Sequence, residues 1–394
     1  MRIGLLMPVS WLEMSKCMEC DFTPPPSHEF PFGSRLAVKL WQLGHEVHVF
    51  SLCHHFDKEI HSSKDGFHIH VAGRRRHFWT NVFDGQRFES EQLKRMIRQW
   101  PCDIYNAHWC YEFARAVVEA NVPHVVTVRD NPWKVLLLFR PKSFRFMRLC
   151  LAYYVIYKAG HLSVASPYMV GYLRKWHNVR EDISVIPNAV PILDLSTCIR
   201  KEKNKIVFVE MASGFSSCKN VKNLLRAFAL LKNKTYPLEV ELRLYGWGYG
   251  PSEECESWAR KNRLADGVVF RGRMEQSDMH REVAEMGDVF VHSSREESFG
   301  AVIVEAMNCG LATIVGAKSG ACSWVTGYGE TGLLVDVNNP VDIADAMYKL
   351  AIDGELRNKF SLAGKNRARE VFSLEKVARQ YLKMYERILS CERT

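Results

Sequence analysis

The sequence predicts an α/β protein with two doubly wound, Rossmann-like domains that face each other across a cleft. Short apolar runs of strand length alternate with helical stretches along most of the chain, which is typical of parallel sheets covered by helices on both faces. A lysine-rich polar stretch at 199–205 divides this alternation into two series. The length of 394 residues also exceeds one ordinary core and suits two domains of about 150–200 residues.

The first series predicts an N-terminal domain over residues 1–190. Its strands are expected at 3–7, 46–50, 103–105, 124–128, 161–164 and 183–186. Helical patterns at 34–42 and 112–120 fall between these strands. Residues 191–204 are then expected to form a linker between the domains.

The second series predicts a C-terminal domain over residues 205–370. Its strands are expected at 206–209, 240–244, 268–270, 288–291 and 312–315, with helices between them. A last helix, at 371–394, is expected to pack back on the N-terminal domain. Ligands of open α/β sheets bind beyond the carboxyl ends of the strands, so the functional residues are expected in the loops that follow strands.

The composition indicates a globular protein, with 47% hydrophobic and 25% charged residues. No apolar run reaches the length of about 18 residues that suggests a membrane span, and the first residues read as a strand and not as a signal peptide. The twelve cysteines show no disulfide framework, so we expect a reducing, cytoplasmic environment. Cys17 and Cys20 form a CxxC pair, but no second pair has zinc-ribbon spacing, and no metal site is predicted.

The net charge of +9 is concentrated in one stretch. Residues 129–180 contain ten lysines and arginines against one acid, Asp130, and large apolar side chains are interleaved with them. Such a mixture predicts that 133–150 binds an anionic membrane peripherally, on its inner face. A solvated amphipathic helix packed on a core is the alternative. No nucleic-acid partner is expected, because the sequence has no recognition motif for one.

The segment 295–305 carries the most informative pattern in the chain. Glu297 lies in a predicted loop after a strand, a Phe-Gly step leads into a helix at 301–308, and Glu305 follows one turn inside that helix. Free N–H groups and the helix dipole at such a position attract an anion. The two carboxylates would accept hydrogen bonds from hydroxyl groups on either side of it, as a nucleotide-sugar provides. The spacing alone also fits two solvated acids.

Lys219 follows the first strand of the second series, where a loop meets a helix. A lysine there could neutralise a diphosphate, although an ordinary solvated lysine is the alternative. The glycines 246, 248 and 250 follow the next strand, but the third comes too early for a dinucleotide fingerprint. We interpret them as a tight turn.

Polar residues also follow strands of the first series. His108 comes after the predicted strand 103–105, where an imidazole could bind a sugar hydroxyl or aid proton movement. A lone histidine is more often structural, and both interpretations stay open. Arg129 and Asp130 end the next strand and are expected to point the same way.

Taken together, these motifs resemble glycosyltransferase family 4, whose members are retaining, nucleotide-sugar-dependent enzymes of the GT-B fold. Glu297 and Glu305 fit the E-x7-E signature of that family, within typical surroundings at 294–307. Further matching segments are 43–47, 186–188, 219–220 and 329–335. His108 lies where such enzymes carry a cleft histidine. The resemblance spans nearly the whole chain and is densest from 205 to 353.

The resemblance implies a donor site without a metal or other cofactor. The implied donor-binding residues are Lys219, Asn220, Glu297, Phe299, Gly300, Ala301 and Glu305. Glu297 would hold the sugar hydroxyls, Glu305 the ribose, and Lys219 the diphosphate, together with backbone N–H groups at 299–301. His108 and Glu297 are the implied catalytic residues. The leaving nucleoside diphosphate would be stabilised electrostatically.

The chain departs from the family pattern in three places. Many members carry an arginine about five residues before the lysine, where this chain has Gly214, so either phosphate neutralisation is weaker or Arg271 or Arg273 substitutes. The paired glycines of the first loop are absent, with Gly33 further on, so the loop 17–32 is expected to be acceptor-specific. Arg129 replaces a common histidine, which would suit an anionic acceptor. The residues assigned to the acceptor side, or left uncertain, are Gly33, Arg129, Asp130 and Arg273.

We therefore expect a cytoplasmic, metal-independent transferase that moves a hexose-type sugar from a nucleotide diphosphate to a glycan or lipid-linked acceptor. Synthesis of cell-surface polysaccharide or lipopolysaccharide is the expected context. The alternatives are a catalytically silent GT-B-like binding protein and a nucleotide-sugar epimerase. The missing arginine and glycine pair keep the first alternative open.

Overall fold

The computed structural model describes residues 1–15, 30–54, 59–192 and 204–392, and the chain falls into two units. The N-terminal unit comprises Met1–Ala189 together with Leu374–Thr394, and the C-terminal unit comprises Val190–Ser373. The predicted CxxC pair, most of the loop 17–32 and most of the linker 191–204 lie outside the described residues.

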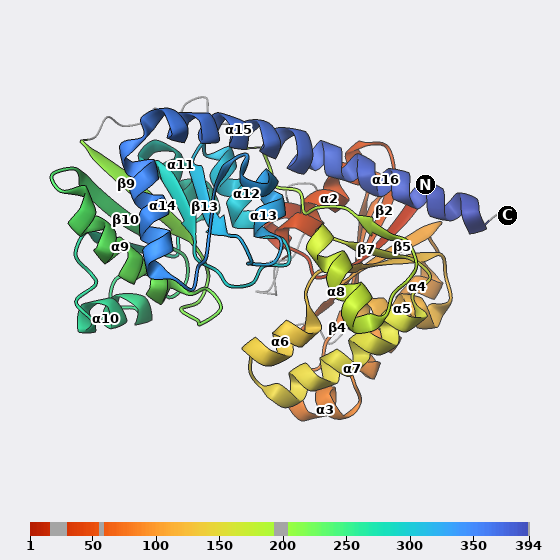
Figure 1. The fold of residues 1–394 in the computed structure, drawn as a ribbon. Helices are drawn as coiled ribbons and strands as arrows, with labels where there is room; N and C mark the ends of the chain where they lie inside the picture. The colour runs from red at the N-terminus through yellow and green to blue at the C-terminus, as the bar shows by residue number, and fades with distance from the viewer. Residues whose placement is uncertain (16–29, 55–58, 193–203, 393–394) are drawn as a thin grey trace. The chain divides into compact units, whose positions relative to one another are not determined.

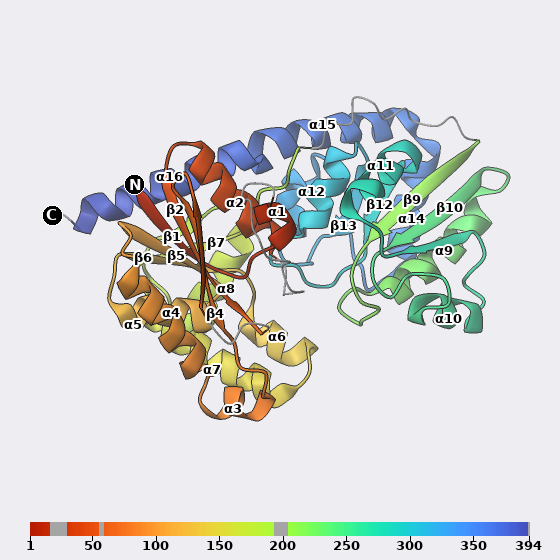
Figure 2. The same ribbon diagram turned by 180° about the vertical axis from the view of Figure 1, so that it is seen from behind.

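The N-terminal unit is built on an eight-stranded sheet of order β3-β4-β2-β1-β5-β6-β7-β8 (Figures 1 and 2). The strands are β1 (Arg2–Leu6), β2 (Glu46–Cys53), β3 (Ile60–Lys64), β4 (Phe67–Gly73), β5 (Ile104–His108), β6 (His124–Val128), β7 (Leu162–Val164) and β8 (Ile183–Val185). All neighbours are parallel except β3 and β4. The chain leaves β1 toward β2 on one side and later adds β5 on the other, so a topological switch point lies between β1 and β5.

Helices cover both faces of this sheet. They are α1 (Trp11–Ser15), α2 (Pro31–Gln42), α3 (Phe78–Phe83), α4 (Arg87–Gln99), α5 (Glu112–Ala120), α6 (Pro132–Leu138), α7 (Lys142–Lys158), α8 (Pro167–His177) and α16 (Leu374–Glu392). Buried side chains of α2 and α16 share one apolar core with the sheet. The helices α4, α5, α7 and α8 form a second core on the other face. The last helix of the chain is therefore part of the N-terminal unit.

The hairpin β3–β4 is an addition to the purely parallel sheet that the sequence predicts. Strand β3 (IHSSK) has a single apolar residue, and β4 (FHIHVAG) alternates apolar residues with histidine, so neither is a continuous apolar run of the kind that predicts the parallel strands. The two-residue turn between them consists of Asp65 and Gly66, both with positive φ (49° and 82°), which is the usual sequence and geometry of a type I′ hairpin. The Asp-Gly step at 65–66 was the sequence feature from which this hairpin could have been predicted.

The C-terminal unit contains a six-stranded, wholly parallel sheet of order β11-β10-β9-β12-β13-β14. The strands are β9 (Lys205–Met211), β10 (Glu239–Tyr245), β11 (Val268–Gly272), β12 (Val289–His292), β13 (Ala312–Gly316) and β14 (Gly332–Val335). The chain moves from β9 outward through β10 to β11 and then resumes at β12 on the other side of β9. This is the doubly wound order, and the prediction of that fold class is confirmed.

The helices of the C-terminal unit lie on both faces of its sheet. They are α9 (Val221–Thr235), α10 (Glu254–Lys261), α11 (Gln276–Met286), α12 (Ala301–Asn308), α13 (Cys322–Val325), the short 3-10 helix η1 (Gly327–Gly329), α14 (Pro340–Ile352) and α15 (Gly354–Phe372). On one face α9 packs against α14, and on the other α12 packs against α15. The helix α12 has the predicted bounds, and Gly310 ends it with φ of +77°.

None of the helices in the described residues combines the length with the apolar character that a membrane span requires.

Candidate active site

The candidate site lies at the topological switch point of the C-terminal unit, between β9 and β12. The loop after β9 carries Lys219, and the loop after β12 carries Glu297. These residues are 78 positions apart in the sequence, yet Nζ of Lys219 lies 2.7 Å from Oε1 of Glu297. The fold therefore brings together the two charged residues that the sequence assigns to diphosphate and sugar.

A row of alternating charges extends from this pair into the core. Oε1 of Glu297 lies 3.2 Å from Nε2 of His292, the last residue of β12. The other ring nitrogen of His292 lies 3.3 Å from Oε1 of Glu210 in β9. Oε2 of Glu210 accepts hydrogen bonds from the backbone N–H and the hydroxyl of Ser293 at 2.9 and 3.2 Å. His292 and Glu210 are both buried, so the row anchors Glu297 from inside.

Electrostatic interactions hold this row in its charged form. Burial alone would lower the pKa of His292, but hydrogen bonds to Glu210 and Glu297 raise that pKa to about 9. Burial opposes ionisation of Glu297, yet His292 and Lys219 hold the pKa of its carboxyl group well below the usual range. Burial would also lower the pKa of Lys219, and the charge of Glu297 reverses this shift. Near neutral pH the site thus contains an ammonium, a carboxylate and an imidazolium.

The loop after β13 holds the backbone of Glu297 from behind. The N–H group of Ala321 donates a hydrogen bond to the carbonyl oxygen of Glu297 at 2.9 Å. This close approach requires glycine at the preceding position. A Cβ on Gly320 would lie 2.1 Å from the same oxygen, and Gly320 has φ of +63°. The placement of the Glu297 carboxylate therefore depends on Gly320.

The helix α12 begins directly after this loop and presents a place for an anion. Gly300 precedes the helix with φ of +87°, and among the described residues no acceptor contacts the backbone N–H groups of 299–301. The ring of Phe299 points into the core, where its centroid lies 6.3 Å from that of Trp324 and 5.5 Å from that of Phe372. The predicted donor contacts of Phe299, Gly300 and Ala301 can therefore come only from the backbone.

Glu305 lies inside α12 and faces α11. Its Oε1 accepts a hydrogen bond from Nε2 of Gln276 at 3.1 Å. Nε2 of the buried His280 lies 3.4 Å from Oε2 of Glu305, without the geometry of a hydrogen bond. Oε2 therefore keeps its capacity to accept a hydrogen bond from a ligand hydroxyl.

The side chain of Asn220 joins the loop after β9 to neighbouring loops. It precedes α9 with φ of +58°, and its side-chain nitrogen donates to the carbonyl oxygens of Ser293 and Val337 at 3.1 and 2.7 Å. Both amide hydrogens are thereby used to join the loop after β9 to its neighbours. A contact of Asn220 with the donor stays a prediction.

The arginine that the family usually carries before the lysine has two predicted substitutes. Arg271 forms an ion pair with Glu282 at 2.5 Å. Arg273 follows β11 at the carboxyl edge of the sheet, where it is exposed and has no ion-pair partner within the described chain. A role of either arginine toward a phosphate stays a prediction.

In the N-terminal unit, His108 is the last residue of β5, which extends beyond the predicted end at residue 105. The imidazole is fully buried, and its Nδ1 accepts a hydrogen bond from Nη2 of Arg129 at 2.7 Å. Burial, reinforced by the charge of Arg129, lowers the pKa of His108 well below its usual value, so the ring is neutral. Its proton then lies on Nε2, which has no partner within the described chain.

Arg129 is buried against this histidine. Its guanidinium donates to His108, to the side-chain oxygen of Asn188 and to the hydroxyl of Tyr381 in α16. These contacts make Arg129 a support for the imidazole and tie the end of β6 to the last helix. Its predicted role toward an anionic acceptor stays a prediction.

The two remaining acceptor-side residues have distinct environments. Both carboxylate oxygens of Asp130 lie 3.1 Å from the hydroxyl of Tyr111, and Asp130 lines a cavity described below. Gly33 lies in the first turn of α2, where a Cβ would come within 2.3 Å of the Phe30 ring and 2.5 Å of the sulfur of Met7. Their roles also stay predictions.

Several residues of the site are absent from the sequence-based prediction. Glu210 and His292 form the inner part of the charged row, and Gly320 sets the backbone of Glu297. A glutamate inside the apolar strand β9 and a histidine ending β12 were the available signals, because a charged group in such a run needs a partner. Nothing in the local sequence marks Gly320.

The fold and the site define a class of protein. A doubly wound sheet whose switch point combines a lysine, two carboxylates and a free helix N-terminus suits a nucleoside diphosphate. Two such α/β units in one chain form the GT-B architecture. Two family models match, "Glycosyltransferase Family 4" over residues 34–192 and "Glycosyl transferases group 1" over residues 196–367. The chain therefore belongs to glycosyltransferase family 4.

Known relatives agree with this assignment. N-acetyl-alpha-D-glucosaminyl L-malate synthase of Bacillus anthracis is 32% identical over 45% of this chain and 44% of its own length. The lipopolysaccharide core biosynthesis glycosyltransferase LpsD of Rhizobium meliloti is 28% identical over 81% of this chain and 97% of its own. The sucrose-phosphate synthase of Thermosynechococcus elongatus has the same fold, with a TM-score of 0.78, 18% identity and 99% of each chain covered. The match thus spans about half of the first relative and nearly all of the second.

Proposed function

We propose that this protein is a retaining glycosyltransferase that moves a sugar from a nucleoside diphosphate to a glycan or lipid-linked acceptor. The observation that carries the proposal is the meeting of Lys219, Glu297 and the N-terminus of α12 at one switch point. A cation and free N–H groups suit a diphosphate, and the two carboxylates suit the hydroxyls on either side of it.

Donor binding would rearrange the charged row at its outer end. Oε1 of Glu297 contacts both Lys219 and His292, whereas Oε2 has no partner within the described chain. The diphosphate competes with Glu297 for Lys219, while His292 continues to hold the carboxylate in place. Glu297 is then able to accept sugar hydroxyls without losing its orientation, and Glu305 accepts those of the ribose.

The leaving nucleoside diphosphate is stabilised by fixed charges and dipoles. In this proposal Lys219, the N–H groups at 299–301 and the predicted substitute Arg273 would meet the developing negative charge. In the N-terminal unit, the proton on Nε2 of His108 suits a hydrogen bond to a sugar hydroxyl, because a buried donor without a partner is costly unless a ligand satisfies it.

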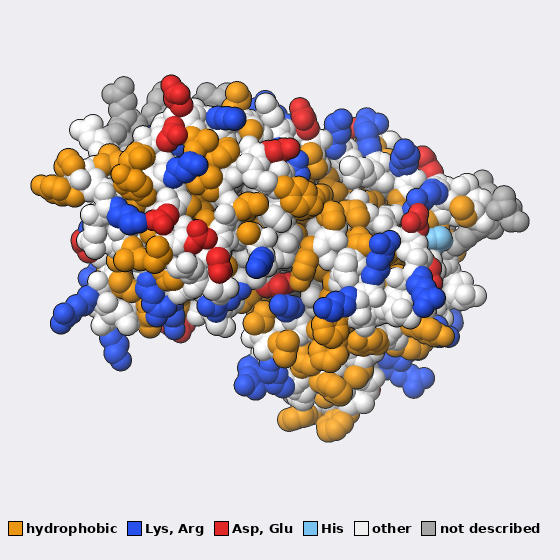
Figure 3. Space-filling view, in the orientation of Figure 1, with side chains coloured by type: hydrophobic (Ala, Val, Ile, Leu, Met, Phe, Trp, Pro, Cys, Tyr) orange, Lys and Arg blue, Asp and Glu red, His pale blue; other side chains and the backbone are white. Residues whose placement is uncertain are grey.

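An exposed surface of the N-terminal unit combines apolar and basic side chains, as a membrane-binding surface does. The surface formed by α3, α6 and α7, here called the α6–α7 surface, exposes Trp79, Phe83, Leu137, Phe139, Phe146 and Tyr157. Figure 3 shows these apolar patches next to lysines and arginines. The stretch 131–160 contains no acidic residue. We infer that this surface seats the enzyme on an anionic lipid bilayer at the cytoplasmic face, consistent with synthesis of lipopolysaccharide or another surface polysaccharide.

Transfer and donor binding can be measured separately. Wild-type protein is incubated with a panel of labelled nucleotide-sugars, with and without membrane extract. The variants Glu297→Gln and Glu305→Gln are compared with Glu239→Gln, which changes an exposed acid at the amino end of β10 in the same sheet. Label should move only with extract, and both site variants should lose transfer while the control keeps it. Donor consumption without extract would indicate an epimerase. Melting-temperature shifts with nucleoside diphosphates but no consumption would indicate a silent binding protein.

The membrane assignment is tested by co-sedimentation with vesicles. Wild type should bind vesicles of anionic lipid more strongly than neutral ones, and replacing Phe139 and Phe146 by serine should weaken that binding. Tyr236→Ser is the matched control, because Tyr236 is 89% exposed in the C-terminal unit. Equal binding to both kinds of vesicle would refute the role of the α6–α7 surface.

A further inference from the structure

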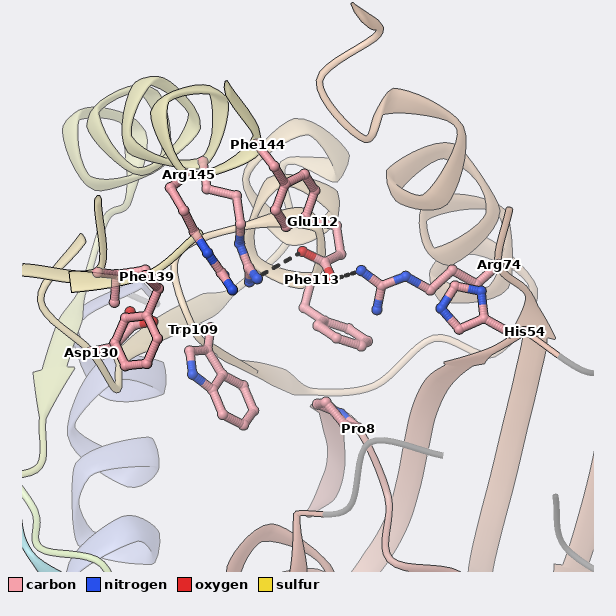
Figure 4. Close-up of a pocket in the computed structure, with 12 residues that line it drawn as sticks. Pro8, His54, Arg74, Trp109, Glu112, Phe113, Asp130, Phe139, Phe144 and Arg145 are labelled. Carbon is pink, nitrogen blue, oxygen red and sulfur yellow. Dashed lines mark ion pairs between the residues drawn. The ribbon is translucent and has the colours of Figure 1, made fainter. Parts of the chain in front are cut away.

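A cavity of about 590 Å³ lies at the carboxyl edge of the sheet in the N-terminal unit (Figure 4). The loops that follow β1, β2, β4, β5 and β6 all contribute to its walls, and α5, α6 and α7 close it. Its size falls in the range of about 300–1,000 Å³ that is usual for small-molecule sites. Its position is also that of ligand sites in open α/β sheets.

The cavity contains three arginines and two carboxylates. Glu112 is buried and pairs with Arg74 at 3.0 Å and with Arg148 at 3.8 Å, as the dashed lines in Figure 4 show. Asp130 accepts from a tyrosine hydroxyl and lies in the field of Arg148 and Arg145. One positive charge is thus left over, and Arg145 is the arginine without an ion-pair partner among the described residues.

Two donors of these arginines have nothing to bind. The Nε atoms of Arg145 and Arg148 are both buried, and neither has a hydrogen-bond partner in the part of the chain that the structure describes. The guanidinium of Arg145 lies between Phe139 and Phe144, at 5.9 and 5.6 Å from the ring centroids. Burial, together with repulsion from Arg148, lowers the pKa of Arg145. A buried N–H donor without a partner is costly unless a ligand satisfies it.

The aromatic side chains of the remaining walls suit the C–H face of a sugar ring. Trp109 and Phe113 also line the cavity (Figure 4). Trp109 has φ of +66°, a conformation that costs about 1–3 kcal/mol for a residue other than glycine and is concentrated at ligand sites. The structure retains this conformation in a loop directly after β5.

We propose that this cavity binds the acceptor, and that Arg145 and Arg148 hold an oxyanion, phosphate or carboxylate, which the acceptor carries beside a sugar ring. The ring lies against Trp109 and Phe113. This inference rests on the proposed function and specifies its acceptor as an anionic saccharide. The net charge of the cavity becomes balanced or negative only when such a group is bound.

Binding of matched sugars tests the proposal. Calorimetric titrations with a neutral hexose, its 6-phosphate and the corresponding uronic acid measure the preference for an anionic group. We expect at least one anionic sugar to bind about tenfold or more tightly than the neutral one, as charge-assisted bidentate contacts would give. Preference for the phosphate or for the uronate identifies the source of the oxyanion. Equal binding of all three sugars, or no binding of the anionic ones, would overturn the inference.

Variants separate this role from a structural one. Arg145→Gln should remove the anion preference without lowering the melting temperature, and Arg145→Lys should keep part of it. Arg174→Gln removes an exposed arginine of α8 and should change neither property. Unchanged preference in Arg145→Gln would refute the role of Arg145. Binding of nucleoside diphosphate, measured on the same proteins, reports on the C-terminal unit, so a failure of the proposed donor site is recognised independently.

Discussion

Replacing Gly320 by alanine should displace the acid that is central to the proposed site. The new Cβ would lie 2.1 Å from the carbonyl oxygen of Glu297, about 1.3 Å short of the 3.4 Å at which ordinary contact begins. Either Glu297 or the loop after β13 has to move by roughly that distance. A misplacement of about 1 Å at a catalytic group costs on the order of 100-fold in rate.

The same substitution also has a cost in stability. Alanine in the left-handed region costs about 1–2 kcal/mol, and loss of the hydrogen bond from Ala321 to Glu297 adds about 1 kcal/mol. We therefore expect Gly320→Ala to lower the free energy of unfolding by about 2–3 kcal/mol, to weaken nucleotide-sugar binding and to reduce transfer by about 100-fold.

Gly44→Ala is the matched control for this experiment. Gly44 also has positive φ, +87°, but a Cβ there has no atom within 4 Å. The control should lose only the backbone cost of about 1–2 kcal/mol and keep full activity. Urea unfolding, calorimetry with nucleoside diphosphates and transfer assays measure the three quantities. If both variants lose the same stability and both keep transfer, Gly320 does not position Glu297.

Three further predictions concern ionisable side chains inside the protein. His292 has a pKa of about 9 in the folded protein against 6.5 in the unfolded chain, so its contribution, up to about 3 kcal/mol, is complete below pH 6.5 and is lost as pH rises through about 9. Urea titrations at about pH 6.5 and pH 9.5 should show this loss in wild type and not in His292→Gln. His70 is buried with a pKa of about 3, so at about pH 5 the unfolded chain binds more protons than the folded chain. The free energy of unfolding should therefore be about 2 kcal/mol lower at about pH 5 than near neutral pH, and His70→Phe should reduce this difference. Arg145→Met should leave the free energy of unfolding within about 1 kcal/mol of wild type, because the cation that it removes is half-buried and its Nε has no partner within the described chain, and a clearly larger loss of stability would contradict this account of the cavity.

The fold and the outer part of the donor site follow from local sequence patterns. Apolar runs of strand length predict the parallel strands, and the E-x7-E segment lies on one loop and one helix, so its spacing is visible in a short window. The bounds of α12 and the glycine that ends it were likewise predicted from a short stretch of sequence. Such features depend on residues close in sequence.

The inner part of the site depends on residues that only the folded sheet brings together. Glu210 and His292 are 82 positions apart, and each alone reads as an irregularity in an apolar strand. Gly320 acts through a contact with the backbone of Glu297, which leaves no pattern at all. In the N-terminal unit, the cavity arginines come from the loop after β4 and from α7, so no single sequence segment predicts an anion-binding site. The sequence analysis did not predict the hairpin β3–β4, because β3 is mostly polar and histidines interrupt the apolar residues of β4.

The helix α16 has a consequence for how the chain is made. Val377, Tyr381 and Tyr385 complete the same apolar core as β1 and β2, and Tyr385 accepts a hydrogen bond from Asn106 at 2.8 Å. The ribosome produces these residues only after the whole segment 190–373, which takes roughly 10–40 s at about 5–20 residues per second. During that interval the apolar surface that α16 covers stays exposed, although α2 already packs on the same face of the sheet. The N-terminal unit, whose synthesis begins first, is therefore completed last.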